Sequence, residues 1–234
     1  MRAAPVLAMT DRSRVNDAHR FRLIVFDWDG TLADSTGLIA HSLQQACRAI
    51  GAPVPDETSA RHVIGLGLVD ALRHVAPTLP QESYQELAGH YRDSYVARES
   101  EIPLFDGVRQ MLDELDAAGF LLAVATGKGR AGLDRALTLQ GLAHRFFATR
   151  CADEGFPKPH PDMLLHLMEQ ASVDPDATLM IGDTSHDLEL ARNAGAAAVA
   201  VAWGAHPAEG LARFGALATV HSIAELRDWL RENA

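Results

Sequence analysis

Three short, almost wholly apolar runs constrain the fold of this chain more than any other feature of its sequence. They are residues 23–26, 120–125 and 178–181, and a polar residue follows each of them within two positions. A continuous apolar run of this length is typical of a strand covered on both faces, as in a parallel sheet with helices on each side. The polar residues after the runs are therefore expected to meet at one edge of that sheet.

The first run ends in two aspartates, Asp27 and Asp29, with Gly30 directly after them. Residues i and i+2 of an extended segment point to the same side, so the two carboxylates can converge. A bound cation or a shared proton must offset their repulsion, and a hard divalent ion would leave one carboxylate free as a nucleophile or proton carrier. The alternative is a strand end at which Asp29 or Thr31 only caps the next helix.

The second run leads into Thr126, Gly127 and Lys128. A hydroxyl, a backbone N–H group and the N-terminus of the following helix together suit a phosphate oxygen, although an ordinary strand-to-helix loop has the same pattern. Lysine occurs only at Lys128 and Lys158, whereas arginine is used elsewhere. A compact ammonium group suits phosphate binding, so both lysines support this interpretation.

Lys158 lies between Pro157 and Pro159, and Pro161 follows closely. Prolines fix the backbone in extended or turn geometry, so they would mount this lysine rigidly. The alternative is a stiff surface loop with an idle lysine. His160 is interpreted as a loop residue.

The third run leads into Asp183, and Asp187 follows four residues later. Both carboxylates can face one way if a helix begins between them, and they would then add oxygen ligands for a hard cation. The alternative is that both acids only favour the N-terminus of that helix.

Residues 37–101 have the pattern of helices separated by polar breaks, without a convincing strand pattern. Gly65 and Gly67 in this stretch could allow a close backbone approach to a substrate, but a simple turn explains them at least as well. The third glycine and the preceding strand of a dinucleotide fingerprint are missing, so no nucleotide cofactor is expected.

Composition excludes some classes of partner. The chain has 234 residues and a formal net charge of -10, which argues against nucleic acid because its binding depends on clustered Lys and Arg. No stretch is long and apolar enough for a membrane span. Cys47 and Cys151 match no metal or redox spacing, so reduced thiols of a cytoplasmic protein are expected. Residues 1–20 are expected to form a disordered tail, with Met9 as an alternative start.

The sequence resembles the haloacid dehalogenase (HAD) superfamily, whose phosphatases carry four motifs in a fixed order. FDWDGTLADS resembles the first motif, Thr126 begins the second, KPHPDML resembles the third and GDTSHDLELARNAG the fourth. The nearest branch is phosphoglycolate phosphatase-like, with a helical cap between the first two motifs. The resemblance implies an α/β fold with a doubly wound, Rossmann-like parallel sheet at residues 21–36 and 102–234 and an all-helical cap at residues 37–101.

The same resemblance implies a Mg²⁺-dependent phosphatase for a small phosphorylated metabolite, such as phosphoglycolate. Asp27 would attack the phosphorus to form an aspartyl-phosphate, and Asp29 would protonate the leaving oxygen and then activate water. The residues assigned to catalysis and phosphate binding besides these two are Thr126, Gly127 and Lys158. The residues assigned to Mg²⁺ are Asp27, the backbone carbonyl of Asp29, Asp183 and, through water, Asp187. A monomer and a homodimer both fit the sequence.

Several other activities occur on this type of core. A haloacid dehalogenase has no need for the acid at Asp29, and the family's phosphonate hydrolases use a cap lysine that residues 37–101 lack. A phosphosugar mutase shares every core motif, so the sequence leaves that alternative open. A non-catalytic phosphate-binding module is disfavoured because all the motif aspartates are present.

Overall fold

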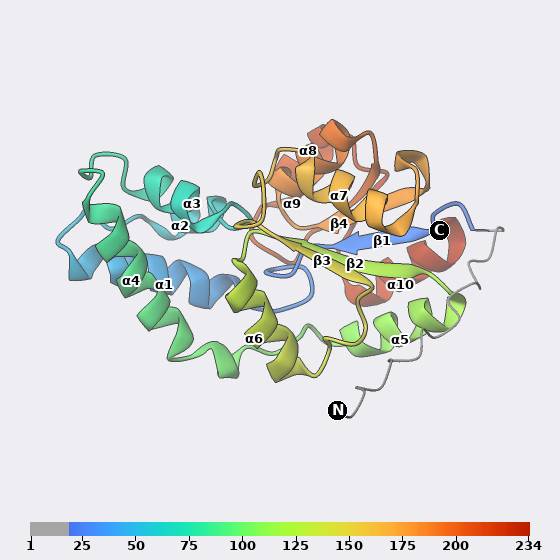
Figure 1. Cartoon of the computed structure of the whole chain (residues 1–234), viewed down its shortest axis with the longest axis horizontal. Coiled ribbons are helices and arrows are strands. Elements are labelled where there is room, and N and C mark those ends of the chain that lie inside the picture. Colours follow the sequence, from blue (N-terminus) through green and yellow to red (C-terminus); the bar gives the residue numbers. More distant parts are fainter. Residues whose placement is uncertain (1–18) are drawn as a thin grey trace, which may run out of the picture.

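The computed structural model describes residues 19–234, and a six-stranded parallel sheet lies at their centre (Figure 1). Of the tail predicted for residues 1–20, all but the last two residues lie outside the described part of the chain. The strands are β1 (Leu23–Phe26), β2 (Leu121–Thr126), β3 (Ala148–Cys151), β4 (Thr178–Gly182), β5 (Ala197–Val201) and β6 (Ala218–Val220). Their order is β3-β2-β1-β4-β5-β6, so the three apolar runs form neighbouring strands at the middle of the sheet.

Helices cover both faces of the sheet, with α5, α6 and α10 on one side and α7, α8 and α9 on the other (Figure 1). These helices are α5 (Val108–Ala118), α6 (Arg130–Gln140), α7 (Asp162–Ala171), α8 (Ser185–Ala194), α9 (Ala208–Leu211) and α10 (Ile223–Asn233). Three short 3-10 turns are η1 (Glu99–Glu101), η2 (Pro175–Ala177) and η3 (Ala212–Phe214). This arrangement confirms the predicted doubly wound α/β fold.

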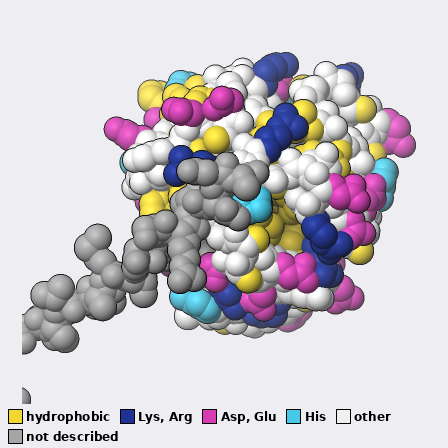
Figure 2. Space-filling view, turned by 90° about the vertical axis from the view of Figure 1, so that its right-hand side faces the viewer, with side chains coloured by type: hydrophobic (Ala, Val, Ile, Leu, Met, Phe, Trp, Pro, Cys, Tyr) yellow, Lys and Arg dark blue, Asp and Glu magenta, His cyan; other side chains and the backbone are white. Residues whose placement is uncertain are grey.

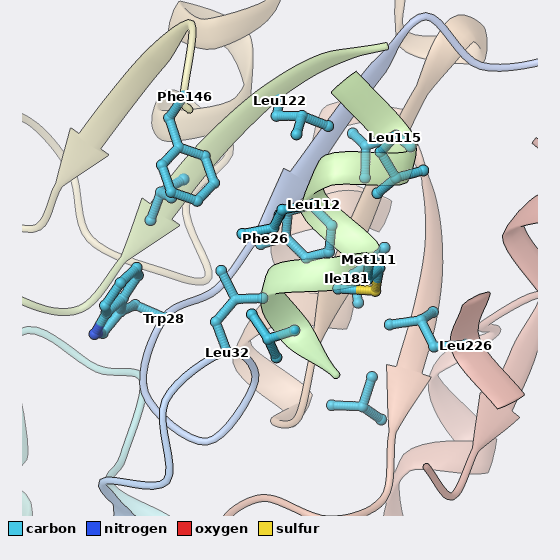
Figure 3. Close-up of a cluster of buried hydrophobic side chains, with 14 of the residues drawn as sticks. Phe26, Trp28, Leu32, Met111, Leu112, Leu115, Leu122, Phe146, Ile181 and Leu226 are labelled. Atoms are coloured by element: carbon cyan, nitrogen blue, oxygen red, sulfur yellow. The ribbon is translucent and has the colours of Figure 1, made fainter. Parts of the chain in front are cut away.

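Alternate side chains of the central strands enter different hydrophobic clusters. In β1, Ile24 and Phe26 belong to one cluster, whereas Leu23 and Val25 belong to the other, because successive strand side chains point to opposite faces. Figure 3 shows the first cluster, in which Phe26 lies against Leu112 of α5. Burial on both faces is the reason that the strands are apolar throughout instead of alternating.

Four further helices stand beside the sheet and not on its faces (Figure 1). They are α1 (Thr36–Ala49), α2 (Glu57–His62), α3 (Leu68–Val75) and α4 (Ser83–Val96), and we call them the helical insert. The insert has its own hydrophobic cluster, in which Leu43, Leu72 and Leu87 are at most 1% exposed. Along the chain, all four helices come after β1 and before β2, where the sequence predicts helices.

The register of the sheet brings the polar strand ends to one level. Phe26 of β1 pairs with Val124 of β2 and with Ile181 of β4. Asp27 follows Phe26 directly, and the polar ends of β2 and β4 lie two residues beyond the paired positions. Three segments that are far apart in the sequence therefore meet at the carboxyl edge of the sheet, where ligands of such folds bind.

Within residues 19–234, every helix is too short or too polar to cross a membrane. On the face that Figure 2 shows, acidic and basic side chains are intermixed wherever the surface is not covered in grey. That face therefore lacks the extended basic surface that nucleic-acid binding requires.

Candidate active site

Three buried aspartates meet at the carboxyl edge of the sheet. Asp27 follows β1, Asp183 follows β4, and Asp187 lies in the first turn of α8. One carboxylate oxygen of each lies within 4.8 Å of the others, and none of the three residues is more than 1% exposed. The helix that begins between Asp183 and Asp187 turns both acids toward Asp27, as the sequence predicts.

Lys158 lies among these carboxylates. Its Nζ is 2.8 Å from Oδ1 of Asp27 and 2.6 Å from Oδ1 of Asp187, and its side chain is fully buried. The lysine in the proline-rich segment is therefore not an idle surface residue. One ammonium group faces three carboxylates, so a further positive charge is required if all three are to be ionised in this buried position.

Neighbouring donors hold two of the acids in place. Thr31 Oγ1 donates to Asp183 Oδ1 at 2.8 Å, and the backbone N–H of Ala205 donates to Oδ2 at 2.7 Å. The Thr184 hydroxyl and backbone N–H donate to Asp187 Oδ2 at 2.7 and 3.0 Å, which closes a capping box at the start of α8. Asp187 thus caps its helix with one oxygen and meets Lys158 with the other, and the metal role expected of it stays a prediction.

The aspartate cluster fits a hard divalent cation. Asp27 Oδ2 is buried and has no hydrogen-bond partner within residues 19–234, which is unfavourable for a carboxylate oxygen unless a cation or a ligand meets it. Carboxylate oxygens are the ligands that Mg²⁺ prefers in proteins. The side chain of Asp29 lies outside this cluster, and the ligand role expected of its backbone carbonyl stays a prediction.

Burial disfavours the ionised acids. It raises the pKa of Asp27 well above its usual value, although the ammonium group of Lys158 opposes this. Burial, together with the nearby Asp187 carboxylate, raises the pKa of Asp183 to about 7. A carboxyl group whose pKa is higher in the folded than in the unfolded chain binds protons on folding. Its contribution to stability therefore falls as the pH rises between the two pKa values.

We accordingly expect Mg²⁺ to stabilise the protein more at about pH 8 than at about pH 5.5, because protons compete with the cation for these acids. The measurement is the free energy of unfolding by urea with Mg²⁺ minus that with EDTA, at each pH. Groups elsewhere in the chain contribute equally to the free energy of unfolding with Mg²⁺ and with EDTA, so their titration cancels in this difference. The Asp183→Asn variant should show a flatter pH dependence, and an equal Mg²⁺ effect at both pH values in the wild type would contradict the expectation.

Asp29 has different partners from Asp27. Its Oδ1 accepts from the Ser35 hydroxyl at 2.6 Å and lies 3.1 Å from Lys128 Nζ. Lys128 also donates to the Tyr95 hydroxyl of α4 at 2.8 Å and lies 4.5 Å from the centre of that ring. Burial is the largest single influence on the pKa of Lys128 and lowers it, but Asp29, Tyr95 and Tyr91 together outweigh burial and raise the pKa above its usual value, so this lysine stays charged.

The sequence predicted that Lys128 helps to bind phosphate, but it did not predict that Lys128 contacts Asp29. Nothing local to either residue indicated Tyr95, which enters the site from the far end of the helical insert. Through Lys128, Tyr95 of the helical insert is therefore connected to Asp29 of the first motif.

A cavity of about 520 Å³ opens over Asp27 and Asp29, between the sheet edge and the helical insert. Gly127 and Lys128 line its floor with the two acids, and Gly65 and Gly67 line it from the insert. Thr126 lies beneath this lining, is fully buried, and accepts the Lys128 N–H on its hydroxyl at 3.1 Å. The phosphate contact expected of Thr126 stays a prediction.

The loop at Gly65 lies very close to Gly127. A Cβ atom added to Gly127 would lie 2.5 Å from the carbonyl oxygen of Leu66 and 2.6 Å from that of Gly65. Gly65 itself has a backbone φ of +94°, a conformation that residues other than glycine rarely adopt. These glycines therefore let the insert approach the floor of the cavity.

Gly127→Ala is expected to push this loop away from the floor, destabilise the protein by about 1–3 kcal/mol and raise KM for a bound substrate. Gly89→Ala in α4 is the matched control, because a Cβ there meets nothing within 4 Å and alanine should stabilise the helix slightly. Thermal unfolding and steady-state kinetics measure both effects. A Gly127→Ala protein with wild-type stability and KM would show that the loop moves freely.

The sequence profile of the haloacid dehalogenase-like hydrolases matches residues 24–201, a span that includes all four motifs and the helical insert. The chain belongs to this family. The match confirms the family that the motifs predict.

Individual relatives match most of this chain. The probable phosphatase IndB of Dickeya dadantii is 37% identical over 195 residues, which cover 81% of this chain and 84% of that protein. The tyrosine-protein kinase PtkA of Mycobacterium tuberculosis is 35% identical over 213 residues, covering 89% of this chain and 72% of the kinase. A phosphoglycolate phosphatase of Vibrio vulnificus is 33% identical over 217 residues, covering 88% of this chain and 95% of its own.

The fold of this haloacid dehalogenase-like hydrolase also agrees with a solved structure. The crystal structure of a predicted phosphatase from Clostridium acetobutylicum has a TM-score of 0.81 and 27% sequence identity. The alignment covers 91% of this chain and 99% of the other. An alignment of this length includes the sheet and most of the remaining described residues.

Proposed function

We propose that this chain is a Mg²⁺-dependent phosphatase that hydrolyses a small phosphomonoester through an aspartyl-phosphate on Asp27. The observation that carries the proposal is the cluster of three buried carboxylates around Lys158 beneath the cavity. The names of the Dickeya and Vibrio relatives support this activity, and the second name makes phosphoglycolate a substrate to test. The helical insert would act as the cap over the site, with residues 37–101 as its bounds.

The proposed reaction begins with attack of an Asp27 oxygen on phosphorus, and the bond from phosphorus to the leaving alcohol breaks. Asp29 would give its proton to the departing oxygen. It lines the cavity, and its Oδ2 has no hydrogen bond within residues 19–234. Asp29 would then take a proton from the water that attacks the aspartyl-phosphate, which releases phosphate and restores the Asp27 carboxylate.

Other residues would hold the reacting groups. Lys158 orients Asp27 through Oδ1 and offsets its charge. The Gly127 N–H and the Thr126 hydroxyl would hold phosphate oxygens near the N-terminus of α6. Asp27, Asp183, the Asp29 carbonyl and, through water, Asp187 would hold Mg²⁺, which would supply positive charge to the transferred phosphoryl group.

The experiment is phosphate release by the whole chain from phosphoglycolate, sugar phosphates and nucleoside monophosphates, with Mg²⁺ or with EDTA. Release that requires Mg²⁺ is the expected result. Isomerised sugar phosphate without phosphate release would indicate the mutase alternative. Binding of phosphate without turnover of any compound would indicate a non-catalytic module.

A further inference from the structure

The two ends of the cavity differ in chemical character. Its floor is polar and carries Asp27, Asp29 and Lys128. Its opposite wall comes from the helical insert and is mainly apolar. The apolar side chains of that wall include Ile39, Leu43, Ile64, Leu68, Tyr91 and Val96. A phosphomonoester would place its phosphate on the floor and its organic part against this wall.

Two tyrosines form the aromatic part of the wall. Tyr91 and Tyr95 lie one turn apart on α4, with ring centroids 5.9 Å apart and ring planes inclined by 23°. Tyr95 is held in place by Lys128, whereas the hydroxyl of Tyr91 has no hydrogen bond within residues 19–234. Tyr91 is only partly buried and lines the cavity, so its ring can contact a bound molecule.

The cavity has little surplus positive charge for a second anionic group. Lys128, whose side chain is 9% exposed, already donates to the Tyr95 hydroxyl and lies 3.1 Å from Asp29 Oδ1. The cavity's two arginines, Arg92 and Arg135, are exposed, and Arg135 pairs with Glu99 at 2.7 Å. Asp70 and Asp153 also belong to the lining, so both signs are present. A substrate with a carboxylate beside its phosphate, such as phosphoglycolate, would gain little from these groups.

The size of the cavity points the same way. A volume of about 520 Å³ lies in the range of pockets that enclose a drug-sized ligand. The two-carbon organic part of phosphoglycolate would leave the apolar wall without a contact. A flat ring would instead bury apolar surface there and stack on an aromatic neighbour.

Resting on the proposed phosphatase activity, we infer that the preferred substrate is a phosphomonoester whose organic part carries a flat, uncharged aromatic or heteroaromatic ring. The ring packs between Tyr91 and the aliphatic side chains of the insert while the phosphate reaches Asp27. This substrate class is narrower than the small phosphomonoesters of the proposed function, and it differs from phosphoglycolate.

The test compares two matched pairs of primary-alcohol phosphomonoesters, so that the chemistry of the leaving oxygen is alike within each pair. Uridine 5′-monophosphate is compared with ribose 5-phosphate, and 2-phenylethyl phosphate with ethyl phosphate; phosphoglycolate is included. We expect kcat/KM for the ring-bearing member of each pair to be higher by about tenfold or more, which is within the range that stacking of a base on an aromatic side chain contributes. Ratios near one, or a preference for phosphoglycolate, would overturn the inference and leave the phosphatase activity standing.

Variants locate the effect. Tyr91→Leu, which keeps an apolar side chain but removes the ring, should reduce the ring-to-ringless ratio of kcat/KM by about tenfold, mainly through KM for the ring-bearing member. Tyr91→Phe should retain the ratio. Tyr84→Leu on the same helix lies outside the cavity lining and should retain it as well. An unchanged ratio in Tyr91→Leu would overturn the role of this ring, whereas no phosphate release from any compound with Mg²⁺ would overturn the phosphatase function itself.

Discussion

Asp27→Asn is expected to lower kcat for phosphate release by a factor of ~10⁴ or more, which is the scale on which hydrolases respond to loss of their nucleophile. Asparagine has nearly the same shape as aspartate, but its amide cannot attack phosphorus to form the covalent intermediate. Its oxygen can still accept from Lys158, whose Nζ lies 2.8 Å from Asp27 Oδ1. The substitution therefore removes the chemistry and retains the position of the side chain.

The same variant is expected to be at least as stable as the wild type in EDTA. Burial raises the pKa of Asp27 well above its usual value, and the charges of Asp187 and Asp183 raise it further, so the ionised side chain is unfavourable in the metal-free protein. A neutral amide removes that repulsion, while Lys158 keeps Asp187 as its partner. Stability gained where activity is lost is common at catalytic residues.

Phosphate release and thermal unfolding, each with Mg²⁺ and with EDTA, test both parts of this prediction. The exposed residue Asp106 supplies the control, since Asp106→Asn removes one carboxylate away from the cluster. Retention of more than about a hundredth of the wild-type kcat by Asp27→Asn would exclude Asp27 as the nucleophile.

Lys158→Met is expected to destabilise the metal-free protein by about 3–5 kcal/mol and to abolish phosphate release. Lys158 supplies the buried positive charge that contacts Asp27 and Asp187, and its own side chain is fully buried. Methionine has a similar length and apolar stem, so it fills the space but leaves both carboxylates without a cation. Removing one partner of a buried ion pair costs more than the pair contributes, because the remaining charges stay buried.

Urea denaturation in EDTA measures this loss. Mg²⁺ should recover part of it, because a cation in the aspartate cluster offsets the same repulsion. The double variant Lys158→Met with Asp187→Asn should be less destabilised than Lys158→Met alone, since one unpaired charge is also removed. A Lys158→Met protein within about 1 kcal/mol of the wild type in EDTA would show that the acids are protonated and need no cation.

Much of the fold could be predicted from local features of the sequence. The apolar runs became the central strands β1, β2 and β4, because a strand buried on both faces needs apolar side chains at every position. The spacing of Asp183 and Asp187 predicted that a helix starting between them would turn both acids the same way, as α8 does. Their meeting with Asp27 followed from the rule that parallel strands end at one edge.

The sequence by itself therefore determined the family, the doubly wound sheet and the acids expected at its edge, because apolar runs, motif residues and helix starts are patterns local to each segment. Only the tertiary structure decided the environment of each acid. Thr31 meets Asp183 across 152 positions of the sequence, and Lys128 meets Tyr95 across 33. The close approach of Gly127 to the loop at Gly65 likewise depends on how the insert packs against the core. Such contacts leave no periodicity or spacing in the sequence, because folding alone brings their partners together.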